Sequence, residues 1–236
     1  MHGGLTIIVP RTEPSMALLG TLISTLSRRV ECIALPLPRE FCIKFVSNVL
    51  SSKDLSWVDD ELGAGEARLW GPVLGVLKVL VRVRPEFNVE CFHSMDYFLR
   101  AREAAVEIAR LVLRVRVGGR VASEEWLDAF SGVIGVREFP ECGNVVIDGY
   151  PYEVLIRGST SVIVLGPIIP TPVDVLGLVA LGYLGKSIID RIVPFVVRYI
   201  GDYVVGSRDL AEAYGRLLTD REYIALVRGL GLPIIL

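Results

Sequence analysis

The chain lacks glutamine entirely and contains asparagine at only three positions, Asn48, Asn88 and Asn144. Depletion of these heat-labile amides is a trend among thermophilic proteins. The chain is also poor in lysine, since arginine accounts for most of its 25 basic residues. We therefore expect a hyperthermophilic, archaeal source, and a GC-rich genome is the alternative explanation of the arginine excess.

Long uncharged segments and an excess of one charge sign are absent too. Acidic and basic side chains interrupt the most apolar stretch, residues 173–205, so no uncharged run reaches the ~18 residues of a membrane span. The net charge of −2 gives no overall attraction to nucleic acid or to acidic membranes. The first residues do not show the basic segment and sustained apolar run of a signal peptide. These features predict a cytoplasmic protein that does not enter the membrane.

The four cysteines, Cys32, Cys42, Cys91 and Cys142, include no C-x-x-C pair. The spacing excludes a zinc ribbon and a thioredoxin-type redox motif. A disulfide between Cys32 and Cys91 or between Cys42 and Cys142 stays open, because intracellular proteins of hyperthermophiles are an exception to the reducing cytosol.

Short apolar runs alternate with segments of helical periodicity. The expected strands are Leu5–Pro10, Val30–Pro36, Val89–Phe92 and Ser161–Leu165, and the expected helices include Met16–Leu26, Arg39–Leu50, Leu69–Val83 and Met95–Val115. This order predicts an α/β fold, with a mainly parallel, doubly wound sheet, helices on both faces and an added β-hairpin around Asp148 and Gly149. We expect a single domain over residues 1–236, with a subdomain boundary near 139–143, and a polar surface loop over Ser51–Glu66.

Polar side chains follow three of the expected strands. They are Arg11, Thr12, Glu13 and Ser15 after the first, His93, Ser94 and Asp96 after the third, and Thr171 and Asp174 after the last. Ligands of open α/β sheets bind beyond these strand ends. If the three strands are neighbours, His93 and the carboxylates of Glu13, Asp96 and Asp174 form a cluster able to hold a divalent metal and activate a water.

The same side chains have two simpler interpretations. Hydroxyl and carboxylate groups at helix starts cap free backbone N–H groups, which suits Thr12, Ser15, Ser94, Asp96 and Thr171. Alternatively, the helix N-termini together with the guanidinium of Arg11 bind a small anion, which needs no catalytic base. Thr12, Ser15, Ser94 and Thr171 are then ligand-binding residues beside Arg11.

Arginines on the long helix after His93 are the candidates for nucleic-acid contact, chiefly Arg100, Arg110 and Arg114. Glutamates at i, i+3 and i, i+4 spacings lie among them, which is typical of a solvated helix face. The opposite face, from Phe98 to Val112, is predicted to be core.

The layout resembles the TraB/ChaN (TIKI-like) superfamily of α/β proteins. The resemblance rests on IIVPRTEPSMALL, VECIALPLPRE, NVECFHSMD and SVIVLGPIIPTPVDVL, in that order along the chain. It implies a metal-dependent hydrolase or peptidase, with a histidine after the first strand, a glutamate after the second and a histidine after a late strand. Here those places hold Pro10 and Arg11, Leu37 and Pro167, so most of the implied metal ligands are missing.

The first strand, TEPS and the following helix are also similar to the nucleotide-sensing CARF domains, in which a helix N-terminus receives phosphate. We expect a thermostable cytoplasmic domain that binds a small anionic ligand or a protein partner, without robust catalysis. The alternatives are a divergent metal-dependent hydrolase and a nucleotide-sensing or nucleic-acid-associated regulator. The apolar segment 173–205 either covers the sheet or forms the subunit interface of a homo-oligomer.

Overall fold

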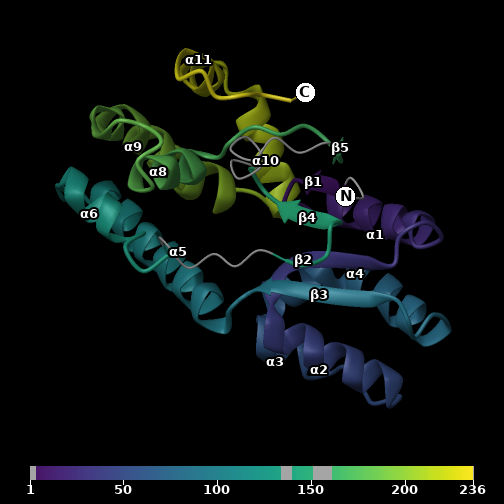
Figure 1. Ribbon diagram of the computed structural model, residues 1–236. Coiled ribbons are helices and arrows are strands. Elements are labelled where there is room, and N and C mark those ends of the chain that lie inside the picture. Colours follow the sequence, from purple (N-terminus) through teal and green to yellow (C-terminus); the bar gives the residue numbers. More distant parts are fainter. Residues whose placement is uncertain (1–3, 134–139, 151–160, 236) are drawn as a thin grey trace. The chain divides into compact units, whose positions relative to one another are not determined.

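The computed structural model describes residues 4–133, 140–150 and 161–235 (Figure 1). The described residues form two compact units, each built from two segments of the chain. Unit 1 lies within Met1–Met95 and Glu138–Ile168, and unit 2 within Asp96–Arg137 and Ile169–Leu236. One of the crossings between the units therefore lies next to the boundary expected near residues 139–143.

Unit 1 is built on a five-stranded sheet in which all pairings are parallel. Its strands are β1 (Leu5–Val9), β2 (Cys32–Pro38), β3 (Asn88–His93), β4 (Val145–Asp148) and β5 (Ser161–Val164). They are arranged in the order β3-β2-β4-β1-β5. The expected α/β fold with a parallel sheet flanked by helices is confirmed.

The first β-strand and the following helix form where the apolar pattern predicts them. The last three residues of β1 are buried, as the β-branched run LTIIV favours. Helix α1 (Glu13–Leu26) begins with the N-cap Thr12 and a proline in its first turn, and it buries Met16, Leu19 and Ile23. It packs beside helix α4 of the same unit.

Three helices connect β2 to β3. Helix α2 (Arg39–Leu50) packs against β3 and α4, and α3 (Val58–Leu62) packs against α4 (Ala64–Val83). The expectation of a loop over Ser51–Glu66 is therefore wrong for its second half. Val58 and Leu62 lie one helical turn apart and are both buried, so tertiary packing stabilises a short helix with a very acidic sequence.

The segment expected as the first half of a β-hairpin is a central strand of the sheet. Residues Val145–Asp148 form β4, which pairs in parallel with β1, from Thr6↔Val145 to Val9↔Asp148, and also touches β2. The expected second half falls largely on residues 151–160, which lie outside the described residues.

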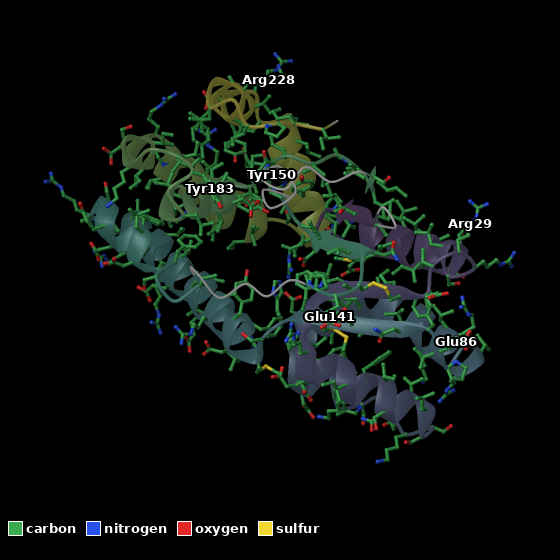
Figure 2. All side chains as sticks on the ribbon, viewed as in Figure 1. Arg29, Glu86, Glu141, Tyr150, Tyr183 and Arg228 are labelled. Atoms are coloured by element: carbon green, nitrogen blue, oxygen red, sulfur yellow. A yellow bond between two sulfur atoms is a disulfide. The ribbon has the colours of Figure 1, made fainter. Side chains whose placement is uncertain are left out.

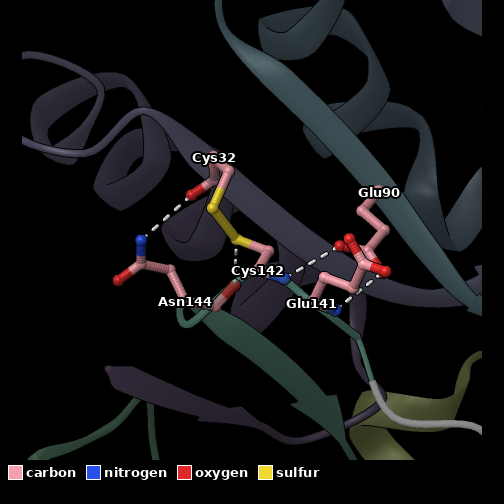
Figure 3. The surroundings of a disulfide bond; sticks show 5 residues. All are labelled: Cys32, Glu90, Glu141, Cys142 and Asn144. Carbon is pink, nitrogen blue, oxygen red and sulfur yellow. Dashed lines mark hydrogen bonds between the residues drawn. A yellow bond between two sulfur atoms is a disulfide. The ribbon is translucent and has the colours of Figure 1, made fainter. Parts of the chain in front are cut away.

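Two disulfides cross-link unit 1, and both pair the cysteines differently from the two pairings left open by the sequence. Cys32 at the start of β2 bonds Cys142 just before β4, with Cα atoms 5.9 Å apart, and Cys42 on α2 bonds Cys91 on β3 at 5.7 Å. Both Cα distances lie in the usual disulfide range. Around Cys142, Glu90 accepts the backbone N–H groups of Glu141 and Cys142 at 3.0 and 2.9 Å (Figure 3).

Unit 2 is helical in its described part. Its elements are α5 (Met95–Arg116), α6 (Ser123–Asp128), α8 (Pro172–Ala180), the 3-10 helix η1 (Lys186–Ile188), α9 (Ile189–Arg198), the π-helix η2 (Tyr199–Val204), α10 (Leu210–Thr219) and α11 (Arg221–Gly229). Trp126, Leu176, Ile192, Val196 and Tyr223 are among the fully buried side chains of one core. The apolar segment 173–205 therefore contributes buried side chains to the core of this unit, among them Val175, Leu176, Ile192 and Val196. No described helix is long and apolar enough to cross a membrane.

Helix α5 buries a face slightly rotated from the predicted one. Ile108 and Val112 are buried as expected, together with Ala104 and Leu111, whereas Ala105 is exposed.

Candidate functional site

Strands β1 and β4 are neighbours in the sheet, but the chain leaves them in opposite directions. After β1 the chain goes on to form β2 on the far side of β4. After β4 it goes on in the opposite direction to form β5 on the far side of β1. In open parallel sheets, ligands bind at the carboxyl ends of two strands whose connections diverge in this way. The ends of β1 and β4 are therefore where the fold places a candidate site.

Arg11, two residues after β1, lies at this point between two carboxylates. Its Nη1 pairs with Oδ2 of Asp148 at the end of β4, and its Nη2 pairs with Oε1 of Glu66 in the first turn of α4. The side chain of Asp148 is only 11% exposed, whereas that of Arg11 is 42% exposed. The guanidinium is thus held by a largely buried carboxylate and still reaches the surface.

Glu66 contributes a second feature to the same cluster. Its other carboxylate oxygen, Oε2, is buried and accepts no hydrogen bond among the described residues. A buried acceptor without a donor costs free energy that a donor from a bound molecule or a water recovers. The cluster of Arg11, Glu66 and Asp148, which we call the switch-point cluster, therefore presents a cation and an unused acceptor together.

The loops after β1, β4 and β5 approach one another around this cluster. Gly149 follows Asp148 with a φ of 89°, and a Cβ built at this residue would lie 3.9 Å from Cδ of Arg11. Gly166, after β5, has a φ of 112°, and its Cβ would lie 3.7 Å from Oγ of Ser15. Positive φ favours glycine at both positions, and the short distances show that these loops lie beside Arg11 and Ser15.

Thr12 and Ser15 lie beside the switch-point cluster but bond to each other. The Thr12 hydroxyl donates to Ser15 Oγ at 2.9 Å and accepts from the Ser15 N–H at 3.4 Å, and both residues are buried. Thr12 thus caps α1, as one of the two simpler interpretations predicts. Their hydroxyls orient the start of α1 and the loop that carries Arg11.

Glu13, the first residue of α1, points to a different basic partner. Its Oε1 lies 2.7 Å from Nε of Arg68 on α4, in an exposed ion pair. Arg68 thus occupies the Glu13 carboxylate, for which the sequence suggests a catalytic or metal-binding role. An exposed pair of this kind adds little stability, but it ties the first turns of α1 and α4 together.

His93 ends β3, which is the edge strand of the sheet. Strands β2 and β4 separate β3 from β1, so three strand spacings of about 4.8 Å lie between the two strand ends. The structure therefore does not make these two strands the neighbours that the His93–Glu13 cluster requires. The His93 ring instead contacts the ring of Phe92, with centroids 4.7 Å apart, and Ser94 directly precedes α5.

Asp96 and Asp174 belong to unit 2, and a site that joins them to Glu13 and His93 stays a prediction. Asp96 pairs with Arg100 one turn along α5, at 2.9 Å. Asp174 accepts from the N–H and hydroxyl of Thr171 at 2.7 and 2.8 Å, while its own N–H donates to the Thr171 hydroxyl. Thr171 and Asp174 therefore form a capping box at the start of α8.

Asp174 also influences a partly buried tyrosine of the same unit. Burial and the negative charge of Asp174 together raise the pKa of the Tyr214 hydroxyl to about 12, against a hydrogen bond with Ile169 that lowers it. The Tyr214 hydroxyl accepts from the Ile169 N–H at 2.8 Å and donates to its carbonyl oxygen at 3.1 Å. The tyrosine stays protonated and acts as a structural link to the segment before α8.

The candidate nucleic-acid contacts on α5 all have carboxylate partners. Arg100 pairs with Asp96, Arg110 with Glu107 at 3.2 Å, and Arg114 with Glu125 through two contacts of 2.7 and 2.8 Å. The hydrogen bonds from Glu125 raise the pKa of the Arg114 guanidinium. These pairs are typical of a solvated helix face.

Within the described part of the chain, no three His, Cys, Asp or Glu side chains are grouped so that they could hold a metal ion. No protein-family model, no curated protein and no solved structure matches the chain. The assignment of a site therefore rests on the geometry alone.

The sequence pattern identifies Arg11 as a candidate but neither of its partners. It places Glu66 in a loop and Asp148 in the turn of a hairpin. The buried pair Val58 and Leu62, spaced by four residues, was the available signal for helix before Glu66. For Asp148, the apolar run Val145–Ile147 was the signal of a buried parallel strand with a polar residue at its carboxyl end.

Proposed function

We propose that this chain is a binding protein for a small anionic ligand and that the switch-point cluster holds the ligand. The observation that supports this most is the position of Arg11, a half-exposed guanidinium between Asp148 and Glu66 at the divergence of β1 and β4. A guanidinium held in a defined orientation binds carboxylate or phosphate through two parallel hydrogen bonds. The net charge of the switch-point cluster further restricts the class of ligand.

The two carboxylates outnumber the single arginine, so a bare anion would meet net negative charge. A ligand that also carries hydroxyl or amino groups avoids this problem, because its donors can bond Asp148 and the free Oε2 of Glu66 while its anionic group binds Arg11. Sugar phosphates, nucleoside monophosphates and amino acids have this combination. We therefore expect such compounds to bind more tightly than inorganic phosphate.

A thermal-denaturation screen of the full chain tests this proposal. A compound present at about 100 times its Kd adds about 2.7 kcal/mol of stability, which raises the Tm by several degrees. Arg11→Lys should abolish most of the shift, because lysine keeps the charge but not the paired donors. Asp148→Asn should weaken binding of hydroxyl- or amino-bearing ligands more than binding of phosphate.

The matched control is Arg29→Lys, since the Arg29 side chain projects away from the ribbon at the far end of α1 (Figure 2). This variant should shift as much as the unmodified chain does. A screen in which no anionic compound raises the Tm contradicts the proposal, and so does a shift that survives Arg11→Lys.

The two alternatives gain no observation of their own. For the metal-dependent hydrolase, Glu13 pairs with Arg68 and His93 ends a strand that is not next to β1. For the nucleotide-sensing or nucleic-acid-associated regulator, the candidate contacts Arg100, Arg110 and Arg114 on α5 are paired with carboxylates. The same screen separates these alternatives, because stabilisation by zinc or manganese that disappears in His93→Ala would favour the hydrolase.

The cytoplasmic location and the thermophilic, archaeal source are part of the same proposal. The two disulfides support them jointly, because disulfide-rich intracellular proteins are a feature of hyperthermophiles. A Tm well above that of mesophilic domains, which lie near 45–65 °C, is the expected result of the first melt.

A further inference from the structure

Helix α5 carries apolar side chains on the face that points away from its own core. Leu99, Val106 and Leu113 are 47%, 53% and 63% exposed, and they recur every seven residues. Seven residues are close to two helical turns, so the three side chains form one narrow stripe along the helix. We call these three residues the α5 stripe.

The surface beside the α5 stripe is concave. An open groove of about 740 Å³ runs along α5 and is bounded across from it by the chain after α6, including Ala129 and Gly132. Leu99 and Val106 of the stripe line this groove, and all of its lining residues belong to unit 2. The apolar stripe thus borders an open hollow whose other lining side chains are largely charged, among them Glu103 and Arg110.

Two opposite charges flank the stripe on the same side. Glu103 precedes Val106 by three residues, which is less than one helical turn, and Arg110 follows it by four, which is more than one turn. Both side chains therefore lie on the same flank of the α5 stripe. Arg110 also pairs with Glu107 on its own helix at 3.2 Å. Exposed ion pairs within a helix are weak, so Arg110 can give up this partner for a carboxylate of another chain. The opposite flank holds Arg102 and Ala109, so between two antiparallel copies Arg102 faces the small side chain of Ala109.

This arrangement is complementary to itself. In two antiparallel copies of α5 related by a two-fold axis near Val106, residues on one flank face the same flank of the other copy. Glu103 of each copy then faces Arg110 of the other, and the interface contains this ion pair twice. The α5 stripes meet between the two pairs, with Leu99 of one copy toward Leu113 of the other. Self-complementarity of this kind is what an isologous two-fold interface requires.

We propose that a second copy of this chain covers the α5 stripe and that the protein is a homodimer through antiparallel α5 helices. The interface is separate from the switch-point cluster, which belongs to unit 1. The dimer therefore does not depend on the proposed ligand. Apolar burial supplies the attraction, and the Glu103–Arg110 pairs select the antiparallel orientation.

Sedimentation equilibrium of the full chain over a wide range of protein concentration tests the dimer. Val106→Glu places two like charges beside the two-fold axis and should raise the dissociation constant of the dimer about 100-fold or more. Ile43→Glu is the matched control, because Ile43 is an exposed apolar residue on α2 of unit 1, with 73% of its surface accessible. It should leave the dissociation constant unchanged.

Charge reversal tests the orientation. Glu103→Arg alone and Arg110→Glu alone each place like charges opposite one another and should weaken the dimer about tenfold. The double variant Glu103→Arg with Arg110→Glu restores opposite charges across the two-fold axis and should dimerise nearly as the original chain does. The Tm of each single variant, compared with that of the original chain, shows whether it is folded.

Three results would overturn the proposal. The first is a chain that stays monomeric at high concentration. If Val106→Glu also lowers the Tm of this monomer, the α5 stripe is covered by another part of the same chain. The second is a dimer that survives Val106→Glu or is lost equally in Ile43→Glu. The third is a double charge reversal that is no better than the single ones.

Discussion

At the scale of single residues, Arg11 combines a structural and a proposed binding role. Its guanidinium separates Asp148 from Glu66, which approach each other from the sheet and from α4. If the cation is removed, two carboxylates remain opposed in a partly buried place. The cost of a buried or half-buried ion pair appears mostly when one partner is taken away.

Arg11→Ala should therefore lower the free energy of unfolding by about 1–3 kcal/mol, measured by urea denaturation at neutral pH. Arg29→Ala provides the comparison, because an exposed arginine without such partners should change the stability by less than about 0.5 kcal/mol. Equal effects of the two substitutions would show that the two ion pairs of Arg11 contribute nothing to folding.

Residue chemistry could be predicted where it depends on near neighbours in the sequence. Two helix caps are recognisable in the sequence, Thr12 before Pro14 and Thr171 three residues before Asp174. Both threonines are N-caps in the structure. The partners of Arg11 could not be predicted in this way. Asp148 lies 137 residues further along the chain, and only the strand order brings it to the end of β1.

At the scale of elements, α11 begins at a carboxylate with three partners. Asp220 accepts the Tyr223 N–H at 3.0 Å, the Tyr203 hydroxyl at 2.9 Å and Nη1 of Arg198 at 3.1 Å. Its burial alone would raise the pKa of the carboxyl group. The hydrogen bonds and the Arg198 charge outweigh that effect, and the pKa lies below its ordinary value.

A lowered pKa in the folded state means that the ionised carboxylate stabilises the fold. Asp220 therefore contributes its full stabilisation above the unfolded-state pKa of about 3.9, and this contribution is lost as the pH falls through the folded-state pKa. In Asp220→Asn the contribution is absent at every pH, so the stability gap to the original chain should narrow as the pH falls below the unfolded-state pKa and through the lowered folded-state pKa. Urea denaturation at a series of pH values measures this gap.

Asp209→Asn is the control for that series, because Asp209 is the N-cap of α10 and accepts the Glu212 N–H at 2.8 Å. The Asp209→Asn variant measures how much stability is lost when an amide replaces a capping carboxylate that has no contacts like those of Asp220 with Arg198 and Tyr203. A gap for Asp220→Asn that stays constant down to the lowest pH would mean that its charge has no part in the stability.

The existence of most elements, though not their arrangement, could be predicted from the sequence. The β-branched run of β1 and the periodic apolar residues of α1 and α4 are local signals, and all three form. The strand order is not local, because a parallel crossover needs only a minimum of about a dozen residues and its length does not fix which strand it reaches. The insertion of β4 between β1 and β2 therefore had no counterpart in the sequence pattern.

At the scale of the whole molecule, two disulfides enclose nested loops of the chain. Cys42–Cys91 spans 49 residues and lies inside the 110-residue span of Cys32–Cys142. Four cysteines allow three pairings, and the spacing alone does not choose among them. The choice follows from the sheet, which brings the start of β2 to the segment before β4 and places α2 against β3.

Reduction of both disulfides should destabilise the chain by about 2–5 kcal/mol for each bond, since long closed loops restrict the unfolded chain most. The measurement is a pair of urea titrations with and without reductant, preceded by peptide mapping of the unreduced protein. Mapping should recover Cys32 with Cys142 and Cys42 with Cys91. Recovery of free thiols, or of another pairing, would contradict the structure.

The central position of β4 has a consequence for synthesis on the ribosome. More than one hundred residues separate the end of β2 from the start of β4, and these include all of α5 and α6. At about 5–20 residues per second, the nascent chain waits roughly 5–20 seconds with β1 and β2 made but without the strand that joins them. Unpaired strand edges invite pairing with other chains. A chaperone that shields these edges until residue 148 has emerged would therefore protect newly made protein more than refolding, full-length protein.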